Sequence, residues 1–115
     1  MSGETNLSKL LATMSPQLQG EAYVFVTVAN GRFADHVHLS PLASFMETEG
    51  LTLVLAQTSA DQAGFSYDAT FKCITLLVHS SLEAVGLTAA VATKLAEKEI
   101  SANVIAAYYH DHIFV

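Results

Sequence analysis

Cationic side chains are scarce in this sequence. It holds five Lys and Arg residues against eleven Asp and Glu, which gives a formal net charge of -6, and the five cations are scattered along the chain. A nucleic-acid backbone or an anionic membrane surface attracts proteins that have a basic face. We therefore expect neither nucleic acid nor a membrane as a partner.

Long apolar runs are absent as well. No segment approaches the roughly 18 consecutive apolar residues of a transmembrane helix. The first ten residues are polar and contain no hydrophobic signal core. These absences predict a soluble cytoplasmic protein.

The sequence has a single cysteine, Cys73. One cysteine excludes an internal disulfide and a zinc site built from several cysteines. Cys73 lies within the apolar run 71–78, where it is expected to be a small buried residue rather than a nucleophile. The serine-hydrolase elbow, the phosphate-binding loop and the dinucleotide fingerprint are also missing. We therefore expect a protein that is not an enzyme and holds no cofactor.

The remaining composition is that of a small folded protein. At 115 residues and 51% hydrophobic residues, the chain forms either one domain or two small halves that share a core. We expect helices at residues 6–14, 40–49 and 86–99, strands at 21–28, 36–39, 51–56, 71–79, 101–109 and from 112 onward, and a loop or short helix at 58–64.

The two halves of the sequence repeat each other. A shift of fifty positions pairs Val28 with Val78, Val54 with Val104 and Asp61 with Asp111, without a gap. Because the order and spacing of the expected elements also agree, we interpret this as a duplication, with a first half at residues 1–68 and a second at 69–115. Such strand–helix–strand units predict helices packed on one face of a sheet.

The strand at 71–79 is apolar on both of its faces, which a single-layer sheet does not need. The second face must be covered by the other half of the chain or by a partner chain. We therefore expect a homodimer or a higher oligomer.

The segment HSSLEAVGLTAAVATKLAEKEISANVIAAYYHDHIFV, residues 79–115, resembles an ACT domain, and EGLTLVL at 49–55 resembles the first half of small bacterial proteins with two ACT-like halves. The resemblance implies an α+β, ferredoxin-like βαββαβ fold with two similar halves and helices on an antiparallel sheet. It also implies kinship with modules that bind amino acids and regulate enzymes. The pattern would continue after Val115 with one more helix and strand, so we expect that this half is truncated or completed from elsewhere.

Residues 80–87 join the end of a strand to the start of a helix. Free backbone N–H groups and the positive helix end make such a loop suited to a carboxylate, and Gly86 would allow close approach of a ligand. In the cytosolic arginine sensor of animal cells, which has similar tandem halves, an acidic residue precedes this glycine. Ala84 and Val85 stand here instead, which favours a small or apolar amino acid.

The resemblance also gives Asp111 a role, as the carboxylate that accepts hydrogen bonds from the α-ammonium group of a ligand. An Asx-turn onto its own backbone explains Asp111 equally well. The expected ligand-binding residues are Ser80, Ser81, Leu82, Val85, Gly86, Leu87, Tyr109, His110 and Asp111.

The sequence His110-Asp111-His112 is not expected to bind a metal. In an extended strand the two histidines lie on one side and Asp111 on the other, so the three cannot hold one ion. The more economical interpretation is a surface hairpin with solvated or interfacial histidines. A zinc or nickel site remains open if this pair meets the His36 and His38 pair, which would lie on one strand face.

Two functions follow from this reasoning. The first is a regulatory ACT-like module that binds an amino acid or a similar small zwitterion. The second is an ACT-fold assembly module that binds no small molecule and acts through the edge or the second face of its sheet.

Overall fold

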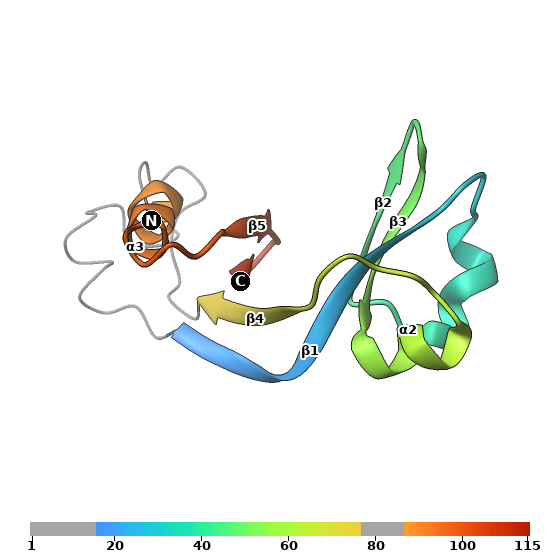
Figure 1. Ribbon diagram of the computed structural model, residues 1–115. Coiled ribbons are helices and arrows are strands. Elements are labelled where there is room, and N and C mark those ends of the chain that lie inside the picture. The colour runs from blue at the N-terminus through green and yellow to red at the C-terminus, as the bar shows by residue number, and fades with distance from the viewer. Residues whose placement is uncertain (1–15, 77–86) are drawn as a thin grey trace. The chain divides into compact units, whose positions relative to one another are not determined.

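The computed structural model describes residues 16–76 and 87–115 (Figure 1). In chain order the elements are β1 (Pro16–Val28), the 3₁₀ helix η1 (Phe33–Leu39), β2 (Ala43–Glu47), β3 (Gly50–Ala56), α2 (Gln57–Ala63), β4 (Phe71–Leu76), α3 (Leu87–Glu97), β5 (Asn103–Ala106) and β6 (Asp111–Phe114). The chain forms two compact units, of which one comprises residues 20–72 and the other the remaining described residues. The expected helix at 6–14 lies outside the described residues.

The unit of residues 20–72 contains three antiparallel strands in the order β2-β3-β1. The central strand, β3, has the sequence GLTLVLA, and five of its residues are buried. Strand β1 pairs with it so that Val24 lies opposite Leu55 and Val26 opposite Leu53. Both strands are rich in residues that pack well on a pleated surface, as the sequence predicts.

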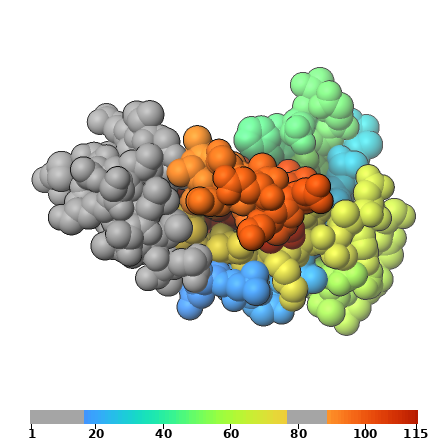
Figure 2. Space-filling model, turned by 60° about the vertical axis from the view of Figure 1, so that its left-hand side comes forward, coloured from blue at the N-terminus to red at the C-terminus, as the bar shows by residue number. Residues whose placement is uncertain are grey.

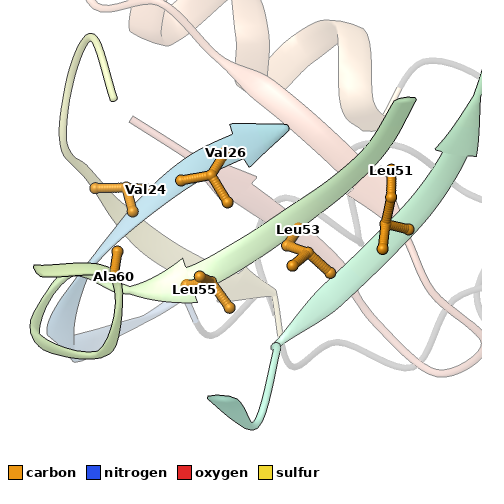
Figure 3. Close-up of a cluster of buried hydrophobic side chains, with 6 residues drawn as sticks. All are labelled: Val24, Val26, Leu51, Leu53, Leu55 and Ala60. Carbon is orange, nitrogen blue, oxygen red and sulfur yellow. The ribbon is translucent and has the colours of Figure 1, made fainter. Parts of the chain in front are cut away.

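The core of this unit lies on one face of the three strands. Figure 3 shows its six side chains, with Ala60 of α2 beside those of the strands: Val24, Val26, Leu51, Leu53, Leu55 and Ala60. Leu39 of η1 and Phe65, which follows α2, pack against the cluster and are partly buried. Both short helices therefore help to shield this face from water.

The second unit contains a further antiparallel arrangement in the order β4-β6-β5. Strand β6 is central, and its residues Ile113 and Phe114 are each 1% exposed. Helix α3 follows the predicted pattern, because Ala90, Val91 and Leu95 are partly buried while Lys94, Glu97 and Lys98 are exposed.

The end of α3 has a defined cap. Glu99 adopts a left-handed conformation with φ of 61°. The N–H of Ile100 bonds to the carbonyl of Leu95 at 2.9 Å, and that of Glu99 to the carbonyl of Ala96 at 2.9 Å. This is the Schellman arrangement, here with a residue other than glycine at the left-handed position.

The expected helix at 40–49 is wrong. Ser40 is not a helix N-cap; its N–H bonds to the carbonyl of Val37, and it ends η1 with φ of 50°. Residues 43–47 form β2, which pairs along its length with β3. The backbone N–H and C=O groups of β3 need hydrogen-bond partners, and residues 43–47 supply them. This pairing outweighs the local preference of residues 43–47 for a helix.

Several expected strands also differ from the structure, among them β1, which begins at Pro16 rather than at residue 21. Residues 36–39 belong to η1 and not to a strand, so this expectation is wrong. Strand β5 covers only 103–106 of the expected 101–109, and β6 begins at Asp111. The expected strand at 71–79 is present as β4 through Leu76, and its last residues lie outside the described part of the chain.

The gap-free repeat of fifty residues does not hold in the structure. By sheet order, β1, β2 and β3 correspond to β4, β5 and β6. Residues 29–42 connect β1 to β2, whereas the longer stretch 77–102 connects β4 to β5. The second half therefore carries an insertion that a fixed shift cannot represent. Within the described residues, no helix is long and apolar enough to cross a membrane.

Candidate functional site

The loop that the sequence analysis selected falls mostly outside the described residues, which leaves out Ser80, Ser81, Leu82, Val85 and Gly86. Leu87 is the first residue of α3. The remaining three residues, Tyr109, His110 and Asp111, lie together where β5 turns into β6. This turn is therefore the part of the candidate site that the structure describes.

The β5–β6 turn is tight and carries exposed aromatic rings. The N–H of Ala107 donates to the carbonyl of His110 at 3.0 Å, which closes the turn. Tyr108 is 82% and Tyr109 72% exposed, and their rings meet edge to face with centroids 4.9 Å apart. Both rings lie in the turn and pack against each other, and neither is buried in the sheet.

Asp111 and His112 face opposite sides of the strand arrangement. Asp111 begins β6 opposite Ala106, and His112 lies opposite both Thr75 of β4 and Ile105 of β5. Successive side chains of a strand alternate between its two faces. The expectation that His110-Asp111-His112 cannot hold one ion agrees with this placement. In the described ranges 16–76 and 87–115, no group of three His, Cys, Asp or Glu residues could hold a metal.

A hydrogen-bonded chain connects three polar side chains on the face of His112. The amide nitrogen Nε2 of Gln19 donates to Thr75 Oγ1 at 3.1 Å, and Thr75 Oγ1 lies 2.9 Å from His112 Nδ1. The hydroxyl can donate to Nδ1 or accept a hydrogen bond from it, according to which ring nitrogen carries the proton.

Sequence reasoning missed Gln19 and Thr75. The available signal was that Thr75 interrupts the otherwise apolar stretch CITLL, where a hydroxyl needs a partner. Thr75 is only 6% exposed. The sequence predicted a surface hairpin with solvated or interfacial histidines. The hairpin is present as β5 and β6, and His112 is half-buried rather than fully solvated, 2.9 Å from Thr75 Oγ1.

The surroundings of His112 favour its neutral form. Burial lowers the pKa of His112 below the ordinary 6.5, and the neighbouring His110 lowers it further, while Asp111 opposes the shift. His110 is partly buried, and its Nδ1 atom is buried with no hydrogen-bond partner among the described residues. Asp111 begins the strand that contains His112, and its carboxylate can accept hydrogen bonds from an ammonium group.

Cys73 is a structural residue, as the sequence predicts. It is 1% exposed in β4, and burial raises the pKa of its thiol. A buried thiol with a raised pKa carries little thiolate and is a poor nucleophile.

His36 and His38 do not form the expected pair on a strand face, because both belong to η1. The ring of His36 lies 6.4 Å from that of Phe65. His38 lines a cavity of about 310 Å³ between η1 and α2, together with Leu39, Ser59, Gln62 and Ala63. None of these five carries a carboxylate or an ammonium group, so the cavity lacks ionic partners for a zwitterion.

Asp61, which the repeat pairs with Asp111, does not line this cavity. Its carboxylate accepts a hydrogen bond from the Tyr67 hydroxyl at 2.7 Å, and Gln57 Nε2 donates to the same hydroxyl at 3.0 Å. These bonds secure the segment that follows α2. The fold and the candidate site define a small α+β module with an antiparallel sheet and polar residues at one strand turn.

Comparison with known protein families identifies the family of this module. Models of the ACT domain match residues 2–72 and 68–115. The chain belongs to the ACT domain family. It is similar to a protein of unknown function from Vibrio cholerae, described as a possible transport protein, whose crystal structure is known. The two are 62% identical with a TM-score of 0.85, over 92% of this chain and 80% of that one. No curated protein matches the chain.

Proposed function

We propose that this protein is a regulatory module of the cytoplasm that binds an amino acid or a similar small zwitterion and catalyses no reaction. The observation that carries the proposal is that ACT models match both parts of the chain. ACT domains are generally small-ligand-binding regulatory modules. In this proposal the chain has two ACT-type βαββαβ halves, divided near residues 68–69, and works as a homodimer or a higher oligomer.

The ligand would bind in the second half. Its carboxylate would be held by backbone N–H groups of the segment 80–87, and its ammonium group by Asp111. The position of Asp111 supports this role, since it is half-buried at the start of β6. A carboxylate in partial shelter from water binds a cation more strongly than one in full solvent.

A thermal-shift screen of the purified protein against the twenty amino acids at millimolar concentration tests this proposal. A ligand at about 100 times its dissociation constant adds about 2.7 kcal/mol of stability, which raises Tm by several degrees in a domain of this size. We expect one or a few amino acids to stabilise the protein. A screen in which none of them shifts Tm would contradict the proposed function.

Two variants locate the binding site. Asp111→Asn removes the proposed ammonium partner and should weaken binding of any hit by about tenfold or more, measured by calorimetry. Asp68→Asn changes an exposed aspartate of the other unit by the same chemistry and should leave binding unchanged. A hit that binds Asp111→Asn as tightly as the parent protein would refute the site while leaving the function intact.

A further inference from the structure

The cavity between η1 and α2 lies within the unit of residues 20–72 and has a volume of about 310 Å³. Figure 1 shows η1 (cyan) beside α2, and the cavity takes its lining from both elements. Atoms of this part of the chain reach the surface in Figure 2, in colours from cyan to yellow-green. Sites for small molecules measure about 300–1,000 Å³. The cavity is therefore large enough for one small ligand.

Each of the two helices contributes one wall of the cavity. Ser59, Gln62 and Ala63 follow each other at positions i, i+3 and i+4 of α2 and so share one face of that helix. His38 and Leu39 are the last two residues of η1. Leu39 and Ser59 are half-buried, whereas the other three are exposed. The cavity thus has an inner end at Leu39 and Ser59 and a rim that is open to solvent.

Both walls are held in place by contacts within the fold. Leu39 packs against the core of its unit, and Ala60 of α2 is 0% exposed. Gly64 ends α2, with its N–H bonded to the carbonyl of Asp61 at 3.1 Å. The Asp61 carboxylate accepts a hydrogen bond from Tyr67. A cavity with fixed walls can bind a ligand without a large cost of ordering.

The lining has no ionic partner to offer. Among the described residues, no Lys, Arg, Asp or Glu lines the cavity. A phosphate or carboxylate group would find no cation there, and an ammonium group would find no carboxylate. Placing a charge in a cavity without a partner is costly, and the net charge of -6 repels anions in addition. The chemistry of the cavity therefore suits an uncharged ligand.

The polar groups of the lining suit a flat ligand with hydrogen-bonding groups along its edge. The amide of Gln62 carries a carbonyl and an NH₂ group in one plane, so it can pair with an edge that has a donor beside an acceptor. The Ser59 hydroxyl can donate and accept. The ring of His38 offers a flat surface for stacking, and Leu39 and Ala63 are apolar. A nucleobase combines two apolar faces with an edge of donors and acceptors.

We propose that this cavity binds a free nucleobase or a similar uncharged planar heterocycle, with the edge of the base on Gln62 and Ser59 and its ring beside His38. The cavity shares no residue with the amino-acid site proposed around Asp111. The module would then respond to two small molecules of different chemical classes. This inference does not depend on the proposed function.

An NMR titration of the full chain, labelled with ¹⁵N, tests the proposal. The probes are adenine, hypoxanthine, cytosine and uracil, each at millimolar concentration. We expect at least one base to shift the backbone amide signals of η1 and α2 in a saturable way. The 5′-monophosphate of that base should bind several-fold more weakly, because the net charge of -6 repels its phosphate and the lining supplies no cation.

Two variants with matched controls locate the site. Gln62→Leu removes the paired hydrogen bonds and should weaken binding by about tenfold or more. Gln17→Leu makes the same change at an exposed glutamine of β1 and should leave binding unchanged. Ala63→Leu fills the cavity and should abolish the shifts, whereas Ala89→Leu, at an exposed position of α3, should not. All four positions are exposed, so we expect the variants to fold, which circular dichroism checks.

Several outcomes would overturn the proposal. They are the absence of binding by all four bases, shifts centred on residues 109–112 instead of η1 and α2, and binding that survives both Gln62→Leu and Ala63→Leu. A monophosphate that binds as tightly as its base would overturn the assignment to an uncharged ligand. Asp111→Asn should bind the base as the parent does, so a failure of this proposal is distinguishable from a failure of the amino-acid site.

Discussion

At the scale of single residues, the partial burial of His112 affects its protonation. The ring lies 2.9 Å from the Thr75 hydroxyl, which itself is 6% exposed. Burial disfavours the charged ring and lowers its pKa, and the neighbouring His110 acts in the same direction. His112 therefore takes up a proton less readily in the folded protein than in the unfolded chain.

This arrangement predicts a specific loss of stability in acid. The folded pKa of His112 lies below the ordinary 6.5, so between these two values the unfolded chain binds more protons than the folded one. Stability then rises with pH across this window and falls as pH is lowered through it. We expect that His112→Gln removes this part of the pH dependence. The measurement is the free energy of urea unfolding at a series of pH values.

Well above pH 6.5, from about pH 8, His112 is neutral in both states, so the difference in unfolding free energy between the parent and His112→Gln should there be constant. That flat region is the internal control. A difference that stays constant down to pH 4 would show that His112 does not couple protonation to folding.

At the scale of elements, the β2–β3 hairpin depends on the backbone of Gly50. This residue has φ of 154°. A Cβ atom there would lie 2.9 Å from the carbonyl oxygen of Val28 and 3.0 Å from Thr27 Oγ1. Residues other than glycine avoid this conformation, and the nearest obstacle is backbone that cannot turn aside.

We expect Gly50→Ala to lower the free energy of unfolding by about 1–3 kcal/mol through this strain and contact. Gly20→Ala is the matched control, since a Cβ atom on Gly20 meets nothing within 4 Å. It should be neutral or slightly stabilising. Chemical denaturation of both variants beside the parent checks the prediction. If Gly50→Ala and Gly20→Ala were equally stable, β1 and β3 would have moved apart near Gly50 with no loss of free energy of unfolding.

At the scale of the whole molecule, the proposed homodimer has to form against the net charge of -6 that each copy carries. Like charges on the two copies repel each other. Because Tm of an associating protein depends on its concentration, we expect Tm of the parent to rise with protein concentration. The rise should be larger in salt, which screens the repulsion.

At high dilution, where the monomer prevails, Tm should reach a constant lower value. Calorimetric scans over a wide concentration range make the comparison. A parent Tm that is independent of concentration would contradict association in solution.

Much of the fold was predictable from local patterns. The apolar run LTLVLA at 51–56 predicted the central strand β3, and the spacing of Ala90, Val91 and Leu95 predicted α3 with its buried face. Tertiary pairing decided β2, because residues 43–47 match a helix locally and become a strand only beside β3.

Less of the candidate site could be predicted from local sequence patterns. Asp111 and the β5–β6 turn were found from the sequence because they are local features. The partners of His112 were not, because Thr75 lies 37 residues away along the chain and Gln19 a further 56 residues from Thr75. The spacing of residues along the sequence does not reveal contacts between segments so far apart. They become predictable only when the pairing register of the strands is known.

The sequence by itself determined the acidic character of this protein, its main strands, the amphipathic helix α3 and its resemblance to the ACT family, since each depends on composition or on neighbours a few positions apart. Only the tertiary structure decided that residues 43–47 form an exposed strand edge and that His112 is partly buried beside Thr75. Both outcomes depend on strand pairing between distant segments, which fixes where backbone groups and buried side chains find their partners.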